Sequence, residues 1–397
     1  MAHCTIAVGV PLRLDYPFAA LLKGLNNTMK SSEAIATPAA RSDVPWWWVD
    51  IGDDEARAIV AAIRDHRIQC GPICRELESR LAEELQVAHV VMMSSGSAAL
   101  AAALMACGIG PGDEVIIPAA SYIATAHACL LIGAKVVLVD IGPDRPVIDP
   151  AGIEAAVTDK TRAIMPVHLN GAACDMGAIG AIAKRHGLRV VEDAAQAFCS
   201  RTSDRFLGTQ GDVGAFSMSI AKLVTTGEGG FAVTNDDDLA DRLHKARNQG
   251  VQAVANNLFD ALGFNFRLTD MLAAMGVAQL GKLEEKVDTT RRVYAFYKEA
   301  LADLPTIDLL PCRIDEGELP LWPVALCRDR ERVVELLAAR GIQTRPVNPC
   351  LAESPQVHCA GRFENAQRFA AAGLRLPGGP DQPRENLERT AEALHDI

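Results

Sequence analysis

The pattern of apolar and polar positions from residue 90 onward alternates between short apolar runs and longer helical periods. Apolar runs of strand length lie at EVIIP (114–118), KVVLVD (135–140), RAIMPVH (162–168) and LRVVED (188–193). Helical patterns lie at 95–108, 121–133 and 176–187. Strands this apolar, separated by helices, predict an α/β fold with a mostly parallel sheet covered on both faces. Ligands bind at the carboxyl ends of such strands, so polar residues there are the candidates for a site.

The pattern changes beyond residue 210. DVGAFSMS (212–219) and GGFAVTN (229–235) predict two strands joined by a turn-rich loop. A long helical stretch over 268–304 follows, and its length suggests the element that carries the chain into a smaller domain. We therefore predict a large domain over 46–285 and a small C-terminal α+β domain over 286–397.

The first 45 residues show no sustained periodicity. We predict a poorly ordered extension over 1–45, with Met29 as an alternative start. Trp46, Trp47 and Trp48 follow, and three adjacent indoles favour burial against the domain or a partner subunit over a ligand platform. The helical pattern after them places Asp53 or Asp54 as its N-cap.

Composition and charge narrow the class of protein. The formal net charge of −11 and the lack of a Lys/Arg run argue against a nucleic-acid surface. No apolar stretch reaches about 18 residues, so no transmembrane helix and no membrane partner are expected. The 11 cysteines are odd in number and scattered, which is typical of reduced thiols in a cytoplasmic protein. Cys70 and Cys74 form a close pair without matching ligands downstream, so no metal site is predicted.

Several polar residues fall where they could bind a pyridine ring that carries an aldehyde and a phosphate. Lys222 lies in the turn-rich loop, and a lysine there can condense with an aldehyde. Asp193 ends a predicted strand, and its carboxylate would keep a pyridine nitrogen protonated, which makes the ring an electron sink. The hydroxyl and N–H donors suited to a phosphate are those of Gly96, Ser97 and Ser217.

Taken singly, each of these signals has an ordinary structural explanation. A lone lysine in a loop is usually a solvated surface residue, and an aspartate after a strand is usually a helix cap. A Ser-Gly-Ser turn before a helix is a common capping sequence. Tyr122 follows a strand and could stack on a ring, but alone it would be read as a core residue. The chemistry therefore depends on their joint arrangement.

That joint arrangement resembles the DegT/DnrJ/EryC1/StrS family of sugar aminotransferases, in collinear order from about residue 50 to the C-terminus. The motifs that carry the resemblance are SSGSAAL (94–100), GIGPGDEVIIPAASYIATA (108–126), PVHLNG (166–171), VEDAAQA (191–197), GDVGAFSMSIAKLVTTGEGG (211–230) and GFNFRLTDMLAAMGVAQL (263–280). The resemblance implies the type I fold of pyridoxal-phosphate-dependent transferases, which is similar to aspartate aminotransferase. It also implies pyridoxal 5'-phosphate as the cofactor.

The resemblance implies a role for each matching residue. Lys222 would hold the cofactor covalently and shuttle a proton, and Asp193 would pair with the pyridine nitrogen. Gln196 would reach the ring hydroxyl and Tyr122 would stack on the ring. The phosphate would be held by Gly96, Ser97, Ser217 and, from the neighbouring subunit, Asn265, which implies a homodimer with shared active sites. The residues expected on the substrate side are His168, Arg267 and Arg345.

Four departures from the family pattern stand out. Ser95-Gly96-Ser97 replaces the usual Asn-Gly-Thr and keeps a hydroxyl. Asn170 stands where an aromatic residue is common, so the substrate-side wall is expected to differ. Phe198-Cys199 replaces a glycine, and Ala221 precedes the lysine where some relatives carry Asn or His. None of these removes Lys222, and retaining it favours transamination over the dehydration that relatives with His at this position perform.

The expected reaction is a two-stage amino transfer. L-glutamate, or L-glutamine as in some relatives, gives its amino group to the cofactor, which then aminates the ketone of a second small molecule. RGIQTRPV (340–347) and LRLPGGP (374–380) resemble members that aminate nucleotide-linked 4-keto-6-deoxy sugars. The alternatives are an aminotransferase for a free keto-cyclitol, as in aminoglycoside pathways, and a non-catalytic regulatory relative. The sequence leaves the ketone and its ring position open.

Overall fold

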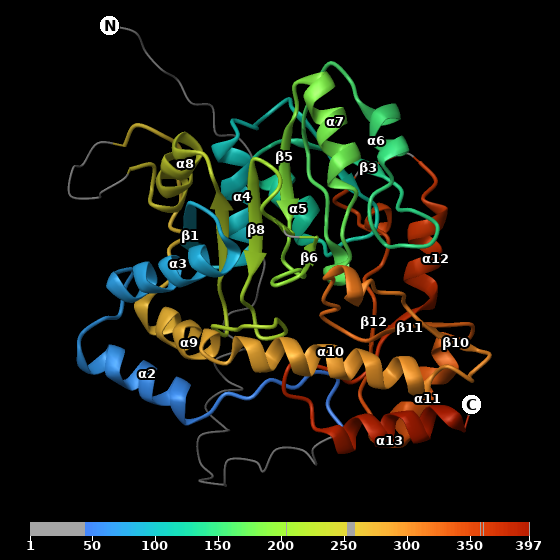
Figure 1. The fold of residues 1–397 in the computed structure, drawn as a ribbon. Helices are drawn as coiled ribbons and strands as arrows, with labels where there is room; N and C mark the ends of the chain where they lie inside the picture. The colour runs from blue at the N-terminus through green and yellow to red at the C-terminus, as the bar shows by residue number, and fades with distance from the viewer. Residues whose placement is uncertain (1–43, 204, 252–258, 358, 360, 397) are drawn as a thin grey trace, which may run out of the picture. The chain divides into compact units, whose positions relative to one another are not determined.

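The computed structural model describes residues 44–203, 205–251, 259–357, 359 and 361–396. A seven-stranded sheet forms its centre, with the strand order β1-β9-β8-β5-β4-β2-β3 (Figure 1). The strands are β1 (His89–Met93), β2 (Glu114–Pro118), β3 (Lys135–Val139), β4 (Thr161–Ile164), β5 (Arg189–Asp193), β8 (Val213–Ser217) and β9 (Gly230–Thr234). β9 pairs antiparallel with β1 and β8, while β2, β3, β4, β5 and β8 run parallel. The mostly parallel sheet predicted from the sequence is confirmed.

Strand β4 is shorter than the apolar run 162–168 predicts. It ends at Ile164, and Pro166 follows two residues later. Because proline has no N–H, it cannot extend the ladder as donor, although its carbonyl still accepts from Asp193 N–H at 2.9 Å. The chain therefore leaves β4 and passes beside the carboxyl end of β5.

Helices cover both faces of the large sheet. Those on one face are α4 (Gly96–Ala106), α5 (Ala124–Leu131) and α8 (Asp237–Arg247), and those on the other are α3 (Pro72–Leu85), α6 (Pro150–Ala156) and α7 (Met176–His186). Alternation along β1 explains the division, since Val91 and Met93 pack with α4 whereas Val90 and Met92 pack with α3. Helix α4 is rich in alanine and buried almost all round, so it lies close against the sheet.

The helical stretch 268–304 is two helices rather than one, which corrects the sequence expectation. Helix α9 spans Asp270–Leu280 and α10 spans Leu283–Ala300. Gly281 lies at the break, where the poor helix propensity of glycine favours a stop. Figure 1 shows α10 running from α9 to the C-terminal helices.

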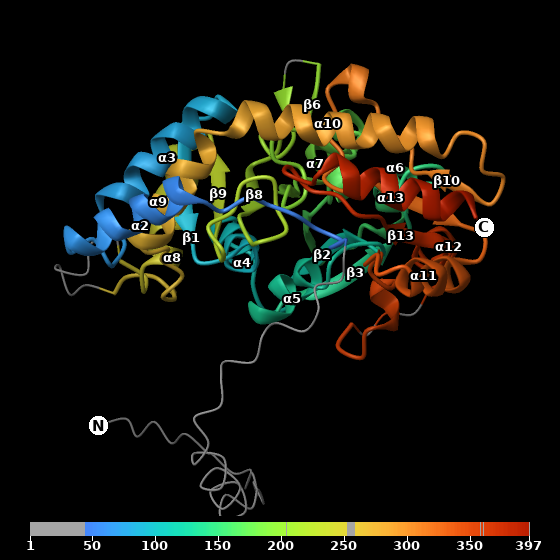
Figure 2. The ribbon, with the colours of Figure 1, turned by 90° about the horizontal axis from the view of Figure 1, so that it is seen from below.

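A second, antiparallel sheet follows α10, with the order β10-β11-β13-β12. Its strands are β10 (Ile307–Leu309), β11 (Val324–Cys327), β12 (Arg345–Pro346) and β13 (Gly373–Arg375). The helices of this region are α11 (Arg330–Ala339), α12 (Glu364–Ala372) and α13 (Arg384–His395), and Figure 2 shows α13 beside α10. The short remaining elements are the hairpin of β6 (Arg201–Thr202) and β7 (Arg205–Phe206) and the 3-10 turns Leu169–Gly171, Ile314–Glu316 and Leu351–Glu353. The predicted domain boundary at 285/286 falls inside α10, and the division into two domains stays a prediction.

The start of the described chain corrects two expectations. Helix α2 (Asp53–Arg64) has Gly52 as its N-cap, and Glu55 accepts from the Gly52 N–H at 2.8 Å. The two aspartates predicted as caps lie instead in the first turn, where carboxylates favour the helix dipole. Val44 is fully buried and pairs with Ile342, so it does not belong to a loose extension. Residues 1–43 lie outside the described residues.

The three adjacent tryptophans have different environments. Trp47 is buried, as expected. Its indole N–H donates to the carbonyl of Ile220 at 2.9 Å, which satisfies the donor inside the protein. Trp46 is half-buried, and Trp48 is exposed. Within the described part of the chain, no helix combines the length and the apolar character needed to cross a bilayer.

Candidate active site

A cavity of about 420 Å³ lies at the carboxyl ends of β1, β5 and β8. Its size is in the range of small-molecule sites. Residues from the large sheet form one side, and residues near the small sheet form the other. The polar and aromatic lining consists of Trp46, Ser95, Ser97, Tyr122, Asp193, Gln196, Ser217, Ser219, Lys222, Glu228, Trp322, Arg345, Asn348 and Arg375.

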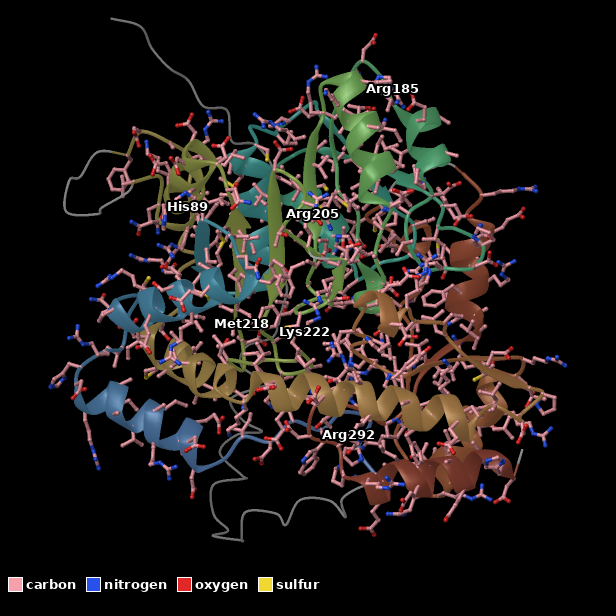
Figure 3. All side chains as sticks on the ribbon, in the orientation of Figure 1. His89, Arg185, Arg205, Met218, Lys222 and Arg292 are labelled. Carbon is pink, nitrogen blue, oxygen red and sulfur yellow. The ribbon has the colours of Figure 1, made fainter. Side chains whose placement is uncertain are left out.

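Lys222 lies in the loop between β8 and β9, at the carboxyl end of β8 (Figure 3). Its Nζ atom is 5.3 Å from the centroid of the Trp322 ring. Burial lowers the pKa of Lys222 to about 8, with Asp193 opposing that shift and Arg375 adding to it. A lowered pKa leaves more of the side chain as the neutral, nucleophilic amine near neutral pH.

Asp193 ends β5 and is buried, with both carboxylate oxygens held. Thr125 Oγ1 donates to Oδ2 at 2.7 Å, and the N–H of Ala195 donates to Oδ1 at 3.1 Å. Ser121 lies 2.7 Å from Thr125 Oγ1 and so donates to it in turn. Burial raises the pKa of Asp193, while these hydrogen bonds and Lys222 act to lower it. These two hydrogen bonds fix the Asp193 carboxyl group in position.

The N-terminus of α4 forms a cradle for an anion. Ser95 caps the helix by accepting from the Ala98 N–H at 3.1 Å, and the N–H groups of Gly96 and Ser97 find no acceptor among the described residues. A Cβ on Gly96 would lie 2.9 Å from Ser217 Cβ, so only glycine lets the helix approach that hydroxyl. Two free N–H groups, a helix dipole and two serine hydroxyls suit a phosphate.

Gln196 and Tyr122 complete this side of the cavity. Gln196 Oε1 accepts from the Asn170 N–H at 2.9 Å, and its amide nitrogen has no partner within the described chain. Tyr122 is 57% exposed and borders the cavity. A buried carboxylate, a lysine with a lowered pKa and a helix N-terminus therefore stand around one space, and this set of donors and acceptors fits pyridoxal 5'-phosphate.

His168 does not line this cavity, which contradicts the expectation of a substrate contact. The side chain is fully buried, and Glu192 lies 2.8 Å from Nε2. The Cys174 N–H donates to Nδ1 at 3.2 Å, so neither ring nitrogen is left for a ligand. The backbone N–H of His168 donates to the Asp193 carbonyl at 3.0 Å, which helps to place the strand end.

Asn265 and Arg267 also lie away from the cavity of the single chain. Arg267 Nε donates to Asn265 Oδ1 at 2.8 Å, and Arg267 Nη1 donates to Asn248 Oδ1 at 3.2 Å. A role for Asn265 in the site of a neighbouring subunit stays a prediction, and so does a substrate role for Arg267.

The small sheet contributes cavity residues that sequence reasoning missed. Trp322 is buried, and Arg375 on β13 has its guanidinium carbon 4.7 Å from the centroid of that ring. Arg345, which was expected on the substrate side, borders the cavity with its guanidinium carbon 4.5 Å from the Trp46 ring. The only sequence signal for Arg375 was a charge within the apolar LRLP run.

Asn170, one of the departures from the family pattern, shapes the cavity wall indirectly. Its amide nitrogen donates to the Trp322 carbonyl at 2.9 Å, and its oxygen accepts from the Trp322 N–H at 2.8 Å. This pair of bonds fixes the backbone that carries the indole. At the other departure, the Phe198 ring packs edge to face on Phe216, and Cys199 takes a φ of +65°, a conformation that favours glycine.

Known proteins match almost the whole chain. The model of the DegT/DnrJ/EryC1/StrS aminotransferase family matches residues 49–395. The GDP-perosamine synthase of Caulobacter vibrioides is 37% identical over 351 residues, which cover 84% of this chain and 95% of that protein. The dTDP-3-amino-3,4,6-trideoxy-alpha-D-glucose transaminase of Streptomyces venezuelae is 37% identical over 351 residues, 86% of this chain and 92% of that protein.

A solved structure gives the same result for the fold. DesV of S. venezuelae, in complex with a ketimine intermediate, superposes with a TM-score of 0.82 at 36% identity and covers 86% of this chain and 93% of its own. The fold class and the family resemblance expected from the sequence are both confirmed.

Proposed function

Since the chain belongs to the DegT/DnrJ/EryC1/StrS aminotransferase family, we propose that it is a pyridoxal-phosphate-dependent aminotransferase that aminates the ketone of a nucleotide-linked keto-deoxy sugar. The observation that carries the proposal is the convergence of Lys222, Asp193 and the α4 N-terminus on one cavity. Relatives that act on GDP- and dTDP-linked sugars support the substrate class. The amino donor we propose is L-glutamate or L-glutamine.

Each residue of the cavity has a task that follows from its chemistry. The bound cofactor supplies a protonated pyridine ring that withdraws the electron pair left behind when a proton leaves the reacting carbon. Asp193 holds the proton on the pyridine nitrogen, and Gln196 donates its amide to the ring hydroxyl. The N–H groups of Gly96 and Ser97 bind the phosphate, together with the hydroxyl of Ser217.

Lys222 carries out the proton transfers. Its amine would hold the cofactor between reactions, and the same Nζ would take a proton from the donor carbon. It later gives a proton to the ketone carbon of the acceptor. The lowered pKa of about 8 suits a group that must accept and return a proton near neutral pH.

Arg345 supports the nucleotide-sugar acceptor over a free keto-cyclitol. It is exposed at the rim of the cavity, stacked on Trp46, and has no carboxylate partner within the described chain. A guanidinium placed in this way suits a diphosphate, which a free cyclitol lacks.

The test compares both acceptor types with two arginine variants. A hydrogen bond to a charged group contributes about 1.5–3 kcal/mol. Because Arg345→Ala removes such a bond, it should raise KM for a nucleotide-linked keto sugar about 10- to 100-fold and leave KM for the amino donor nearly unchanged. Arg340→Ala is the matched control, because Arg340 pairs with Asp396 on the surface. Efficient amination of a free keto-cyclitol, with every nucleotide sugar refused, would overturn the proposed acceptor.

We also propose that the active unit is a homodimer in which Asn265 serves the partner's site. The segment around Asn265 exposes Phe259, Leu262 and Phe264, and apolar side chains gathered in this way are typical of a covered interface. A cytoplasmic location, expected from the scattered cysteines, stays a prediction.

Mixed dimers test the shared site. A dimer of one Lys222→Ala chain and one Asn265→Ala chain has one site free of both changes only if Asn265 acts across the interface. Activity above that of either parent is then expected. No recovery, with mixed dimers verified by mass, would mean that each site is built within one chain.

A further inference from the structure

Arg375 is a buried cation without an anionic partner. Its side chain is on β13 and only 7% exposed, and no carboxylate of the described chain forms an ion pair with it. Nη1 donates to the Pro346 carbonyl at 3.0 Å and Nη2 to Asn348 Oδ1 at 3.4 Å, while Nε has no partner among the described residues. Burying a guanidinium in this way is costly unless an anion completes it.

A second cation stands beside Arg375 and increases that cost. Arg345 is its register partner on the neighbouring strand β12. Burial, followed by the charge of Arg345, lowers the pKa of Arg375 to about 10. Two adjacent arginines that lack acidic partners within the described chain make this wall of the cavity attractive to anions, although the whole protein carries a net charge of −11.

Arg375 is close to the reacting group. The guanidinium carbon of Arg375 and the Nζ of Lys222 lie near the same Trp322 ring, at 4.7 and 5.3 Å from its centroid. The sum of the two distances sets an upper limit of about 10 Å on their separation. An anion held by Arg375 is therefore within one small molecule's length of the carbon at which Lys222 moves a proton.

We propose that Arg375 binds the carboxylate of the amino donor, whereas Arg345 serves the acceptor. In an amino acid, the carboxylate is bonded to the carbon that carries the amine, so it must lie close to Lys222. In a nucleotide sugar, a sugar ring separates the ketone from the diphosphate, and the outer, exposed Arg345 suits that group. The inference rests on the proposed aminotransferase function and adds a donor site to it.

The hydrogen-bonding capacity of Arg375 matches a carboxylate. A guanidinium has five N–H donors, and two are used by Pro346 and Asn348. Nε and Nη2 share one edge, which is the edge that pairs with both oxygens of a carboxylate. On that edge, Nε makes no hydrogen bond to a described residue, and the Nη2 bond to Asn348 is long at 3.4 Å. A carboxylate bound there would therefore form one new hydrogen bond and replace a weak one.

The two half-reactions of the holoenzyme separate this proposal from its alternatives. In the donor half-reaction, L-glutamate or L-glutamine aminates the cofactor, and the loss of the cofactor's yellow colour is followed in single turnovers. The acceptor half is followed as the colour returns when a nucleotide-linked keto sugar meets the aminated form. The binding of glutarate, a dicarboxylate without an amine, is measured by calorimetry and needs no turnover.

Arg375→Met should raise the half-saturating donor concentration about 30-fold and weaken glutarate similarly, with less than a threefold change in the acceptor half. Arg375→Lys keeps the positive charge but cannot form two parallel hydrogen bonds to a carboxylate, so its donor and glutarate affinities should lie between those of the wild type and Arg375→Met. Arg345→Met should show the opposite pattern, with a defect in the acceptor half alone.

Three results would overturn the assignment. Unchanged donor and glutarate binding in Arg375→Met would remove the carboxylate site. A defect confined to the acceptor half would assign Arg375 to the sugar. Equal losses in both halves with a lowered melting temperature, not restored in Arg375→Lys, would make the residue a structural brace. A wild-type enzyme that reacts with no amino acid would refute the proposed function, while glutarate binding would still decide the carboxylate site.

Discussion

The two sides of the active-site cavity differ in how their charged groups are held. On the cofactor side, Asp193 accepts from Thr125 and Ala195. On the substrate side, Arg375 and Arg345 come from neighbouring strands of the small sheet and have no carboxylate partner within the described chain. The carboxylate proposed to hold the cofactor ring is therefore fixed by the protein's own hydrogen bonds, whereas the two arginines proposed to bind the substrates await an anion from outside the chain.

The largest effect is expected from removing Lys222, the group proposed to act on both the cofactor and the substrates. Lys222→Ala should lower turnover by about 10³-fold or more, since one group supplies the anchoring amine and both proton transfers. Lys135→Ala is the matched control, because Lys135 pairs with Glu114 at the amino ends of β3 and β2, away from the cavity. Steady-state rates with both variants measure the effect, and near-normal turnover in Lys222→Ala would refute the mechanism.

A smaller effect is expected from the bonds behind Asp193. Thr125→Val removes the 2.7 Å hydrogen bond to a buried carboxylate, so cofactor affinity should fall about 10- to 100-fold. Ser121→Ala removes only the hydrogen bond between Ser121 and Thr125, which does not contact Asp193, and should lower cofactor affinity less. Cofactor dissociation constants measured by fluorescence quenching would test this. Equal affinity in all three proteins would mean that Asp193 needs no support.

The lowered pKa of Lys222 predicts the smallest of these effects, a pH dependence of cofactor uptake. The neutral amine reacts, and with a pKa of about 8 it is populated as pH rises through 8. The rate at which the apoprotein takes up cofactor should therefore rise up to about tenfold per pH unit below 8 and level off above it. A rate still rising at the same slope from pH 9 to 10 would indicate an ordinary lysine.

The sequence located the cavity residues of the large sheet better than those near the small sheet, and there is a physical reason. Asp193, Ser217 and Gly96 lie at strand ends or at a helix start, and local patterns locate such positions. Trp322 and Arg375 meet Lys222 from 100 and more residues away along the chain. Only the packing of the small sheet against the large one brings them there, and no periodicity records that contact.

Local chemistry also explains the elements that were placed wrongly. The stretch 268–304 keeps an apolar helical pattern through Gly281, yet α9 ends at Leu280 and α10 begins at Leu283, with Gly281 at the break. The family resemblance placed His168 on the substrate side. It is instead buried against Glu192, since both ring nitrogens find partners inside the protein. Val44, which was expected in the loose extension, is held by a parallel bridge to Ile342, a residue far away in the sequence.

Chemical trapping of the cofactor tests directly whether Lys222 is the residue that holds it. Borohydride reduction of the purified holoenzyme, followed by proteolysis and mass spectrometry, locates the lysine that carries it. We expect the cofactor mass on the peptide containing Lys222, and no labelled peptide from Lys222→Ala under the same conditions. A label on another lysine, or an unlabelled wild-type protein that still transaminates, would contradict it.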